Sequence, residues 1–169
     1  MERSLSSCIR IAAVALLLTA AGCGFHLRGQ VALPFETLHV LADNPGSTFA
    51  TDLRRAVRAA STTRLTDNPK EAQVTLRIVS ELRERSILSL SSGGRVRELQ
   101  LRYRVAYRAY DQQSKDYLPA GEIVLKRDLT YNDTDVIAKE QEEVLLYRDM
   151  QTDAVQQLVR RLQAARASS

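Results

Sequence analysis

Histidine and cysteine, the side chains that most often carry catalysis or hold metal ions, are scarce in this sequence. The chain of 169 residues has two histidines, two cysteines and no tryptophan. His26 and His39 stand alone, so the spacing of a zinc site is missing. No serine lies in a glycine-flanked elbow, and Asp111 and Asp116 fall in a stretch that we expect to be a solvated loop. We therefore predict a protein that is not an enzyme and uses no cofactor or metal.

Long hydrophobic runs are also missing. The one apolar stretch, residues 11–21, is shorter than the roughly 20 residues that a membrane-spanning helix requires. Arg3 and Arg10 precede it and small residues follow it, which is the pattern of an export signal. Ala20 stands where lipoprotein signals usually carry leucine. Residues 1–22 are thus predicted to be a lipoprotein signal peptide, and Cys23 is the predicted lipidation site.

Removal of this leader would take away Cys8 and leave Cys23 as the only cysteine. An internal disulfide and a cysteine-based zinc site are then both excluded. Gly24, in place of aspartate, is typical of lipoproteins sent to the outer membrane, where we expect a lipid-anchored protein that faces the periplasm. The alternative is an ordinary secretory signal cut after Gly22, which would leave a free thiol.

The basic residues of the chain are mostly arginine. The net charge is +4, and of the 24 basic residues only four are lysine. Basic domains often bind nucleic acid, but an exported chain has no access to it, so we expect no nucleic-acid partner. Arginine also forms bidentate hydrogen bonds with phosphate. Phosphorylated lipid headgroups are the abundant matching ligand outside the cell.

The first part of the exported chain predicts a strand and a helix. Residues 23–36 have no clear period and are expected to form a tether. Residues 37–41 are apolar and predict a strand, and a turn signal follows at 43–46. Ser47 or Thr48 can cap the next helix. One face of that helix is apolar, with members Phe49, Leu53, Ala56, Val57 and Ala60.

From Ala72 onward the period changes to two, which predicts strands. The first strand has apolar residues on one parity up to Leu90 and polar ones, including Arg83 and Arg85, on the other. Residues 91–94 are expected at the tip of a hairpin. The following strands are expected at 99–107 and 123–131, separated by a polar loop at 111–121. A long helix is predicted from Thr134, its expected N-cap, to about Ala165.

This order predicts an α+β fold. Strand, helix and three further strands, followed by a helix, should form a four-stranded mixed sheet with both helices packed on one face. Residues 37–166 would form this single domain, and 167–169 a short tail. The opposite face should be polar and rich in arginine.

The start of the exported chain, Cys23-Gly24-Phe25-His26-Leu27-Arg28, resembles that of the lipopolysaccharide-assembly lipoprotein family LptE. Looser similarities are Leu53-Arg54-Arg55-Ala56-Val57-Arg58 and Ala138-Lys139-Glu140. The resemblance implies a subunit that plugs the lumen of the outer-membrane β-barrel LptD, helps that barrel to assemble and takes part in lipopolysaccharide delivery to the outer leaflet. The implied partners are an LptD-type barrel, lipopolysaccharide and outer-membrane lipid.

The resemblance also implies a lipopolysaccharide-binding site at two places. Lys139 occupies the first, near the start of the last helix. At the second, near the hairpin tip, Ser92 stands where an arginine is expected, and Arg95 and Arg97 lie close by as candidates. The alternative interpretation is a Lys139 paired with Glu142 or Glu143 and a hairpin tip that is simply solvated.

The row of Arg102, Arg104 and Arg108 on the polar face has two interpretations. It forms either an ordinary solvated surface or one that docks on a partner. Because arginines on alternate positions repel one another unless acids or a partner lie opposite, docking is the favoured hypothesis. The overall alternative is a free-standing envelope lipoprotein that binds a ligand without a barrel, and a third hypothesis is an envelope hydrolase with an unrecognised site.

Overall fold

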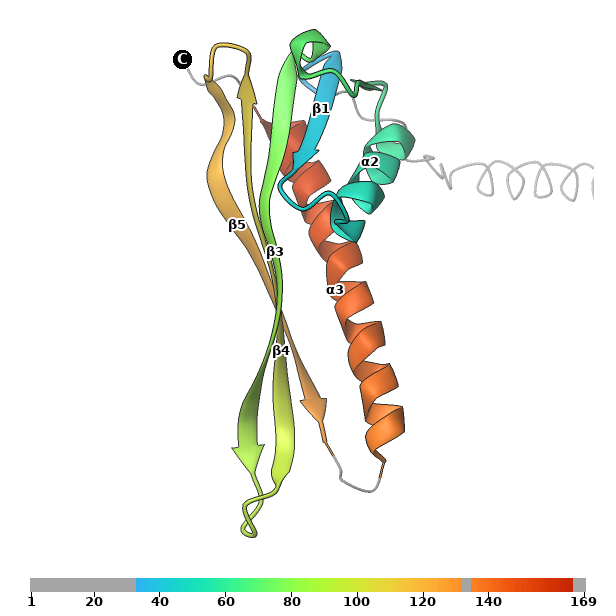
Figure 1. The fold of residues 1–169 in the computed structure, drawn as a ribbon, viewed down its shortest axis with the longest axis vertical. Helices are drawn as coiled ribbons and strands as arrows, with labels where there is room; N and C mark the ends of the chain where they lie inside the picture. The colour runs from blue at the N-terminus through green and yellow to red at the C-terminus, as the bar shows by residue number, and fades with distance from the viewer. Residues whose placement is uncertain (1–32, 132–134, 166–169) are drawn as a thin grey trace, which may run out of the picture.

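The fold is seen in a computed structural model, which describes residues 33–131 and 135–165. The elements are, in order, β1 (Thr37–Ala42), α2 (Thr48–Ala60), β2 (Arg64–Leu65), a 3-10 turn (Pro69–Glu71), β3 (Val74–Leu90), β4 (Val96–Asp111), β5 (Asp116–Thr130) and α3 (Val136–Ala164). The sheet has the strand order β2-β1-β3-β4-β5. Its three long strands twist into a ribbon that extends well beyond β1 and α2 (Figure 1).

The topology confirms the predicted α+β fold with a mixed sheet and two helices. β1 pairs in parallel with β3 across the α2 connection, and β3, β4 and β5 form an antiparallel meander. Two details differ from expectation. The two-residue β2 adds a fifth strand beside β1, and it is too short to produce a periodic signal. The polar loop predicted at 111–121 is wrong in extent, because β5 already begins at Asp116; an exposed edge strand can be as polar as a loop.

Helix α2 forms where its cap and its apolar stripe predict it. Ser47 is the N-cap residue, and its Oγ accepts a hydrogen bond from the N–H of Ala50 at 3.0 Å. Phe49, Leu53 and Val57 are completely buried against the sheet. Each such side chain contributes about 1.5–3 kcal/mol by leaving water, so this face holds α2 in place.

Among the described residues, helix α3 is the longest helix, at 29 residues. At about 1.5 Å per residue it is roughly 44 Å long. Asp135 occupies the N-cap position and makes no side-chain capping bond, while the expected cap, Thr134, lies outside the described residues. Its C-terminal half is the buried half, with Met150, Ala154, Leu158 and Leu162 at 0% exposure.

The expectation that β3 keeps one apolar parity throughout is wrong. A bulge lies between Ile78 and Ser80, so two residues of β3 oppose one of β4. Before it, Val74, Leu76 and Ile78 face the core. After it the parity inverts, and Arg83 turns toward α3 instead of the outer face. Leu82, on the parity expected to be buried, is 46% exposed.

Candidate functional site

The two predicted halves of the lipopolysaccharide site lie at the same end of the molecule. Figure 1 shows the hairpin between β3 and β4 and the start of α3 both at the lower end, away from β1 and α2. The hairpin carries Arg95 and Arg97, and the first turns of α3 carry Lys139. Strand β3 runs to this end, β4 leaves it, and β5 returns the chain to it, where α3 begins (Figure 1). The topology therefore places residues about 40 positions apart in the sequence at one end of the molecule.

Lys139 is held by its own helix. Its Nζ lies 2.8 Å from Glu142 Oε2, one turn further along α3, and the lysine side chain is 22% exposed. This is the ion pair of the alternative interpretation, with Glu142 as the partner. Glu143 instead pairs with Arg85 of β3, at 3.5 Å. Exposed pairs of this kind contribute only about 0–1 kcal/mol, so a stronger anion can replace Glu142 at small cost.

The hairpin tip is an ordered turn with exposed arginines. The N–H of Ser91 donates to the carbonyl of Arg95 at 2.7 Å, and Ser91 Oγ accepts from the N–H of Arg95 at 3.1 Å. Gly94 has a φ of +76°, which the turn needs and which side chains with a Cβ rarely adopt. Ser92, Arg95 and Arg97 are all exposed. The turn thus presents two guanidinium groups next to the position where Ser92 replaces the expected arginine.

The arginine row on the outer face is paired by acids of the same sheet. Arg104 lies 2.9 Å from Glu122 on β5 and 3.8 Å from Glu84 on β3. Arg102 lies 3.9 Å from the same Glu84. Because these acids separate the guanidinium groups, a partner is not needed to relieve repulsion, and the main argument for docking at this row is removed.

Arg108, the third arginine of that row, is also paired with an acid of the neighbouring strand. Arg108 Nε donates to Asp116 Oδ1 of β5 at 2.6 Å, and this hydrogen bond raises the pKa of the guanidinium. Arg77 of β3 donates two hydrogen bonds of 2.9 Å to Asp43, which directly follows β1. These bonds lower the pKa of the Asp43 carboxyl. On the outer face, these arginines are therefore each paired with an acidic side chain.

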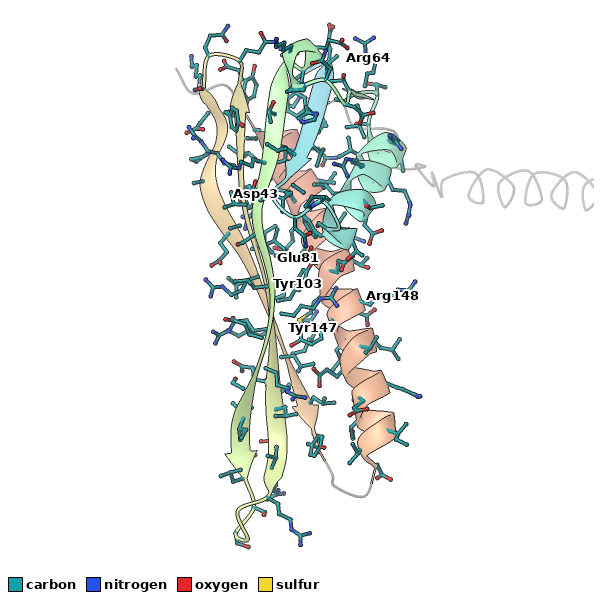
Figure 2. All side chains as sticks on the ribbon, viewed as in Figure 1. Asp43, Arg64, Glu81, Tyr103, Tyr147 and Arg148 are labelled. Atoms are coloured by element: carbon teal, nitrogen blue, oxygen red, sulfur yellow. The ribbon has the colours of Figure 1, made fainter. Side chains whose placement is uncertain are left out.

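A polar cluster on the helix-covered face was not found from the sequence. The bulge in β3 turns Glu81 inward, where Oε1 accepts from the Tyr103 hydroxyl at 2.7 Å and Oε2 from Ser47 Oγ at 2.8 Å. Figure 2 shows Glu81 and Tyr103 together in the middle of the molecule, with Tyr147 just below. Burial and the bond to Glu81 raise the pKa of Tyr103 far above its usual value, so its hydroxyl stays protonated as a donor.

Gln151 of α3 joins both helices to the sheet in the same region. Its Oε1 accepts from Arg83 at 2.9 Å and from Thr48 Oγ1 at 3.2 Å, and its Nε2 donates to Asp52 at 2.7 Å. The guanidinium of Arg83 also lies 5.6 Å from the ring centre of Tyr147. These contacts position α2, α3 and β3 relative to one another, and nothing in the spacing of the sequence signals them.

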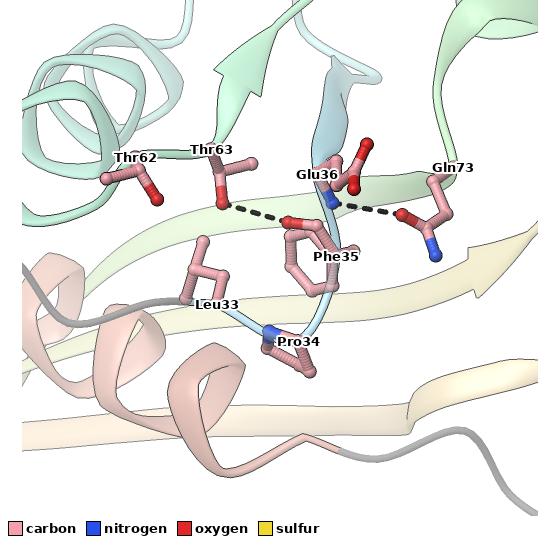
Figure 3. Close-up of a pocket in the computed structure, with 7 residues that line it drawn as sticks. All are labelled: Leu33, Pro34, Phe35, Glu36, Thr62, Thr63 and Gln73. Carbon is pink, nitrogen blue, oxygen red and sulfur yellow. Dashed lines mark hydrogen bonds between the residues drawn. The ribbon is translucent and has the colours of Figure 1, made fainter.

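The chain enters the described domain beside a cleft at the other end of the sheet. Figure 3 shows its lining, which comprises Leu33, Pro34, Phe35, Glu36, Thr62, Thr63 and Gln73. Thr63 Oγ1 donates to the carbonyl of Phe35 at 3.0 Å, and the N–H of Glu36 donates to Gln73 Oε1 at 2.9 Å. Leu33 and Phe35 belong to the core, so the end of the predicted tether segment is held firmly. The predicted site at Cys23 lies outside the described residues.

The fold and these surfaces define a class: a small α+β domain in which two helices pack on a mixed sheet and the arginines of the outer face lie beside acidic side chains. Within the ranges that the structure describes, no helix has the length and apolar character of a membrane span. The same ranges contain no cluster of three or more side chains suited to a metal ion.

Comparison with known proteins identifies the particular family. The family model LptE, described as lipopolysaccharide-assembly, matches residues 35–162. The LPS-assembly lipoprotein LptE of Yersinia pestis is 30% identical over 159 residues, which cover 90% of this chain and 73% of the relative. That of Photorhabdus laumondii is 27% identical over 153 residues, covering 86% and 80%. The chain belongs to the LptE family.

Two solved structures of lipoproteins are similar to this chain in fold. The solution structure of an uncharacterized lipoprotein B from Nitrosomonas europaea matches with a TM-score of 0.73 at 42% identity, over 83% of this chain and 91% of that one. The crystal structure of the rare lipoprotein B from Shewanella oneidensis matches with a TM-score of 0.65, over 73% and 91%; at 23% identity it supports the fold alone. Through its family, this chain is a non-enzymatic lipoprotein of lipopolysaccharide assembly and outer-membrane biogenesis.

Proposed function

We propose that this protein is the lipid-anchored subunit that plugs an LptD-type outer-membrane β-barrel, helps it to assemble and takes part in lipopolysaccharide delivery to the outer leaflet. The observation that carries the proposal is the match of the family model to residues 35–162. The paired charges of the outer sheet face support it, because barrel lumens are lined by polar side chains. A surface whose ions are already neutralised loses little when it enters such a lumen.

The anchor in this proposal is a lipid on Cys23, at the outer membrane. Two or more acyl chains give stable anchoring at about 0.8 kcal/mol per buried methylene. Ten positions separate Cys23 from Leu33, which is buried in the core. An extended chain spans at most about 3.3–3.6 Å per residue, so the anchor would keep this end of the domain within about 36 Å of the bilayer. The end that carries Lys139 is the opposite one (Figure 1).

The ligand site in this proposal comprises Lys139, Arg95 and Arg97. Lipopolysaccharide carries phosphates, and charge-assisted hydrogen bonds from lysine or arginine to phosphate are among the strongest that a protein surface offers. Lys139 would exchange Glu142 for a phosphate, and the hairpin would supply guanidinium groups from the other side. Where such contacts are exposed, added salt should weaken them.

The test of the function is complex formation with the barrel. The full chain and the LptD-type barrel of the same organism would be co-expressed and purified in detergent. A stable 1:1 complex is the expected result, together with loss of surface lipopolysaccharide when the chain is depleted. A solitary monomer that binds ligand without the barrel would instead support a free-standing lipoprotein.

Exchange of Lys139 for glutamate tests the ligand site. Lys139→Glu should weaken lipopolysaccharide binding about tenfold, equivalent to about 1.4 kcal/mol, because an attractive contact to phosphate becomes repulsive. Binding would be titrated with labelled lipopolysaccharide at low and high salt. Arg148→Glu is the matched control, since it makes the same charge change on an exposed position of α3 further from the hairpin. Equal affinities for the two variants would show that Lys139 is an ordinary surface residue paired with Glu142. Both variants should still associate with the barrel.

A further inference from the structure

Half of β3 has an edge that no other strand of the described residues covers. β1 pairs with β3 only along Val74–Ile78, and the last bond on that side joins the N–H of Asp43 to the carbonyl of Ile78 at 3.1 Å. Beyond that point β3 continues to Leu90 with β4 on one side and no strand of the described chain on the other. In Figure 1 the lower half of β3 accordingly has an open flank. An open edge offers unpaired backbone N–H and C=O groups to another chain.

The direction of these groups follows from the register. The N–H of Tyr131 donates to the carbonyl of Arg97, so this parity of β4, which includes Leu99 and Leu101, faces β5. Opposite Leu99 and Leu101 lie Ile87 and Arg85 of β3, which are therefore at non-hydrogen-bonded positions of the antiparallel pair. Their N–H and C=O groups point away from β4, into the open flank. Arg83 and Glu81 share this parity.

The usable part of the edge runs from Ser80 to Ile87. Bulges bound it on both sides, after Ile78 and after Ile87, and the segment between them is about 26 Å long at about 3.3 Å per residue. It contains neither proline nor glycine. Native proteins protect such edges with bulges and charges. Here the bulges limit the edge without closing it.

The charged side chains of this segment form hydrogen bonds or ion pairs within the molecule. Glu81 accepts bonds from Tyr103 and Ser47, and Arg83 donates to Gln151. The remaining pairs are Glu84 with Arg102 and Arg104, and Arg85 with Glu143. Their charges therefore oppose an approaching strand much less than unpaired charges would. Next to them Leu82 and Ile87 are 46% and 59% exposed, one on each face, and would gain cover from the side chains of an added strand.

The opposite edge of the sheet is less suited to pairing. β5 carries Pro119, which has no N–H, and Gly121 in its first half. Its second half lies beside α3 (Figure 1), to which Arg127 is joined through Asp153 at 2.8 Å. The edge of β3 is thus the one that a partner can use without displacing a helix.

We propose that the edge of β3 between Ser80 and Ile87 receives an extended peptide segment of the barrel partner by strand addition. The inference rests on the barrel association proposed above and names the surface that mediates it. Only a polypeptide backbone supplies N–H and C=O groups at the strand repeat, which acyl chains and sugars do not. The position continues that of β1, so the added segment would extend the sheet along the edge that β1 leaves free.

Amide hydrogen exchange in the purified complex tests the proposal directly. The full chain alone and its complex with the LptD-type barrel would be compared at single-residue resolution. The N–H groups of Arg83, Arg85 and Ile87 should exchange at least about tenfold more slowly in the complex. Those of Leu82, Glu84 and Ser86, which β4 already covers, should change little. Complex formation without this alternation would overturn the proposal.

A proline variant with a matched control provides the second test. Arg85→Pro removes one outward N–H and leaves the β3–β4 ladder intact, since proline is tolerated on the open side of an edge strand. Arg85→Ala removes the same side chain and its pair with Glu143 but keeps the N–H. The proline variant should lose at least about tenfold in affinity for the barrel relative to the alanine variant, with both melting temperatures measured.

Four results would contradict strand addition. Equal affinities of two folded variants would show that the outward N–H is unused. Slowing of the same amides by lipopolysaccharide micelles without the barrel would assign the edge to the lipid instead. A wild-type chain that forms no complex at all would overturn both this inference and the proposed function, whereas a complex without amide protection would overturn the inference alone.

Discussion

At the scale of single residues, the position of Glu81 organises the middle of the molecule. One carboxylate accepts hydrogen bonds from Tyr103 of β4 and from Ser47, the N-cap of α2. Its side chain is only 13% exposed, so its charge is stabilised mainly by these donors and by Arg83 nearby. A buried acceptor that loses a donor costs about 1–3 kcal/mol. This residue therefore couples the orientation of α2 to the sheet.

Tyr103→Phe tests that coupling through pH. At neutral pH the variant should lose about 1–2 kcal/mol of unfolding free energy, because Glu81 keeps only one hydroxyl donor. Burial, followed by the bond to Glu81, raises the pKa of Tyr103 in the folded state. An unfolded tyrosine ionises near about 10. Below that pH both states hold the proton and the contribution is complete, whereas above it only the unfolded state releases the proton and stability falls.

Urea unfolding at neutral pH and above pH about 10 would measure this effect. Wild type should lose stability in the alkaline range more steeply than the phenylalanine variant. Tyr110→Phe, which removes a tyrosine hydroxyl elsewhere on β4, is the matched control. Identical alkaline slopes for wild type and Tyr103→Phe would show that the buried hydroxyl does not contribute.

At the scale of elements, the bulge in β3 decides which side chains meet. The extra residue at Val79 allows Val74, Leu76 and Ile78 to face the core while Glu81, Arg83 and Arg85 also face the helices. In a regular strand these two sets would lie on opposite faces, because successive side chains alternate. One strand thus contributes to an apolar core in its first half and to a polar junction in its second.

Deletion of Val79 should keep the second half of β3 on its present face. Val79 is the extra residue opposite β4, so without it Ile78 and Ser80 become neighbours, and Glu81 stays beside Tyr103. We expect a loss of about 1–3 kcal/mol, the ordinary range for single changes, because the local twist changes while the polar junction is kept. Val79→Ala is the control, and it should cost under about 1 kcal/mol because Val79 is 45% exposed. Thermal unfolding measures both, and a deletion variant that no longer folds would show that the junction depends on the bulge itself.

At the scale of the whole molecule, two ends have different surroundings. The end where the chain enters the domain is tied down by Leu33 and Phe35, and the proposed anchor lies ten residues before it. The other end carries the hairpin, the start of α3 and the free edge of β3 (Figure 1). The long ribbon separates the two, so one chain can be held at a bilayer and still present its basic residues away from the anchor.

Cys23→Ser tests the anchored end. The variant should be processed poorly or released from the membrane, because a serine cannot carry the thioether-linked lipid and no described helix could span a bilayer instead. Membrane fractionation in cells that lack the barrel is the measurement, and the wild-type chain in the same cells is the control. A variant that stays fully membrane-bound there would contradict lipid anchoring at this residue. The described domain should be unaffected, since it begins beyond this position.

Much of the fold could be predicted from local patterns. The periods of two and 3.6 located the four main strands and both helices, and a turn signal followed by Ser47 located the cap of α2. These features depend on neighbours in the sequence, so the sequence carries them directly. The family was recognised from short motifs, and so were the candidates Cys23, Lys139, Arg95 and Arg97, whose roles stay predictions.

Other features were decided only by tertiary structure. The bulge at Val79, the pairing of Arg104 with Glu122 and of Arg102 with Glu84, and the two-residue β2 all depend on which strands lie side by side. A sequence pattern states which residues alternate, but it does not state what lies opposite them or where one residue too many shifts the register. By itself the sequence determined the elements and the family, because both depend on short-range patterns. The tertiary structure decided which charges are neutralised and which edge of the sheet stays open, because both depend on contacts between distant residues.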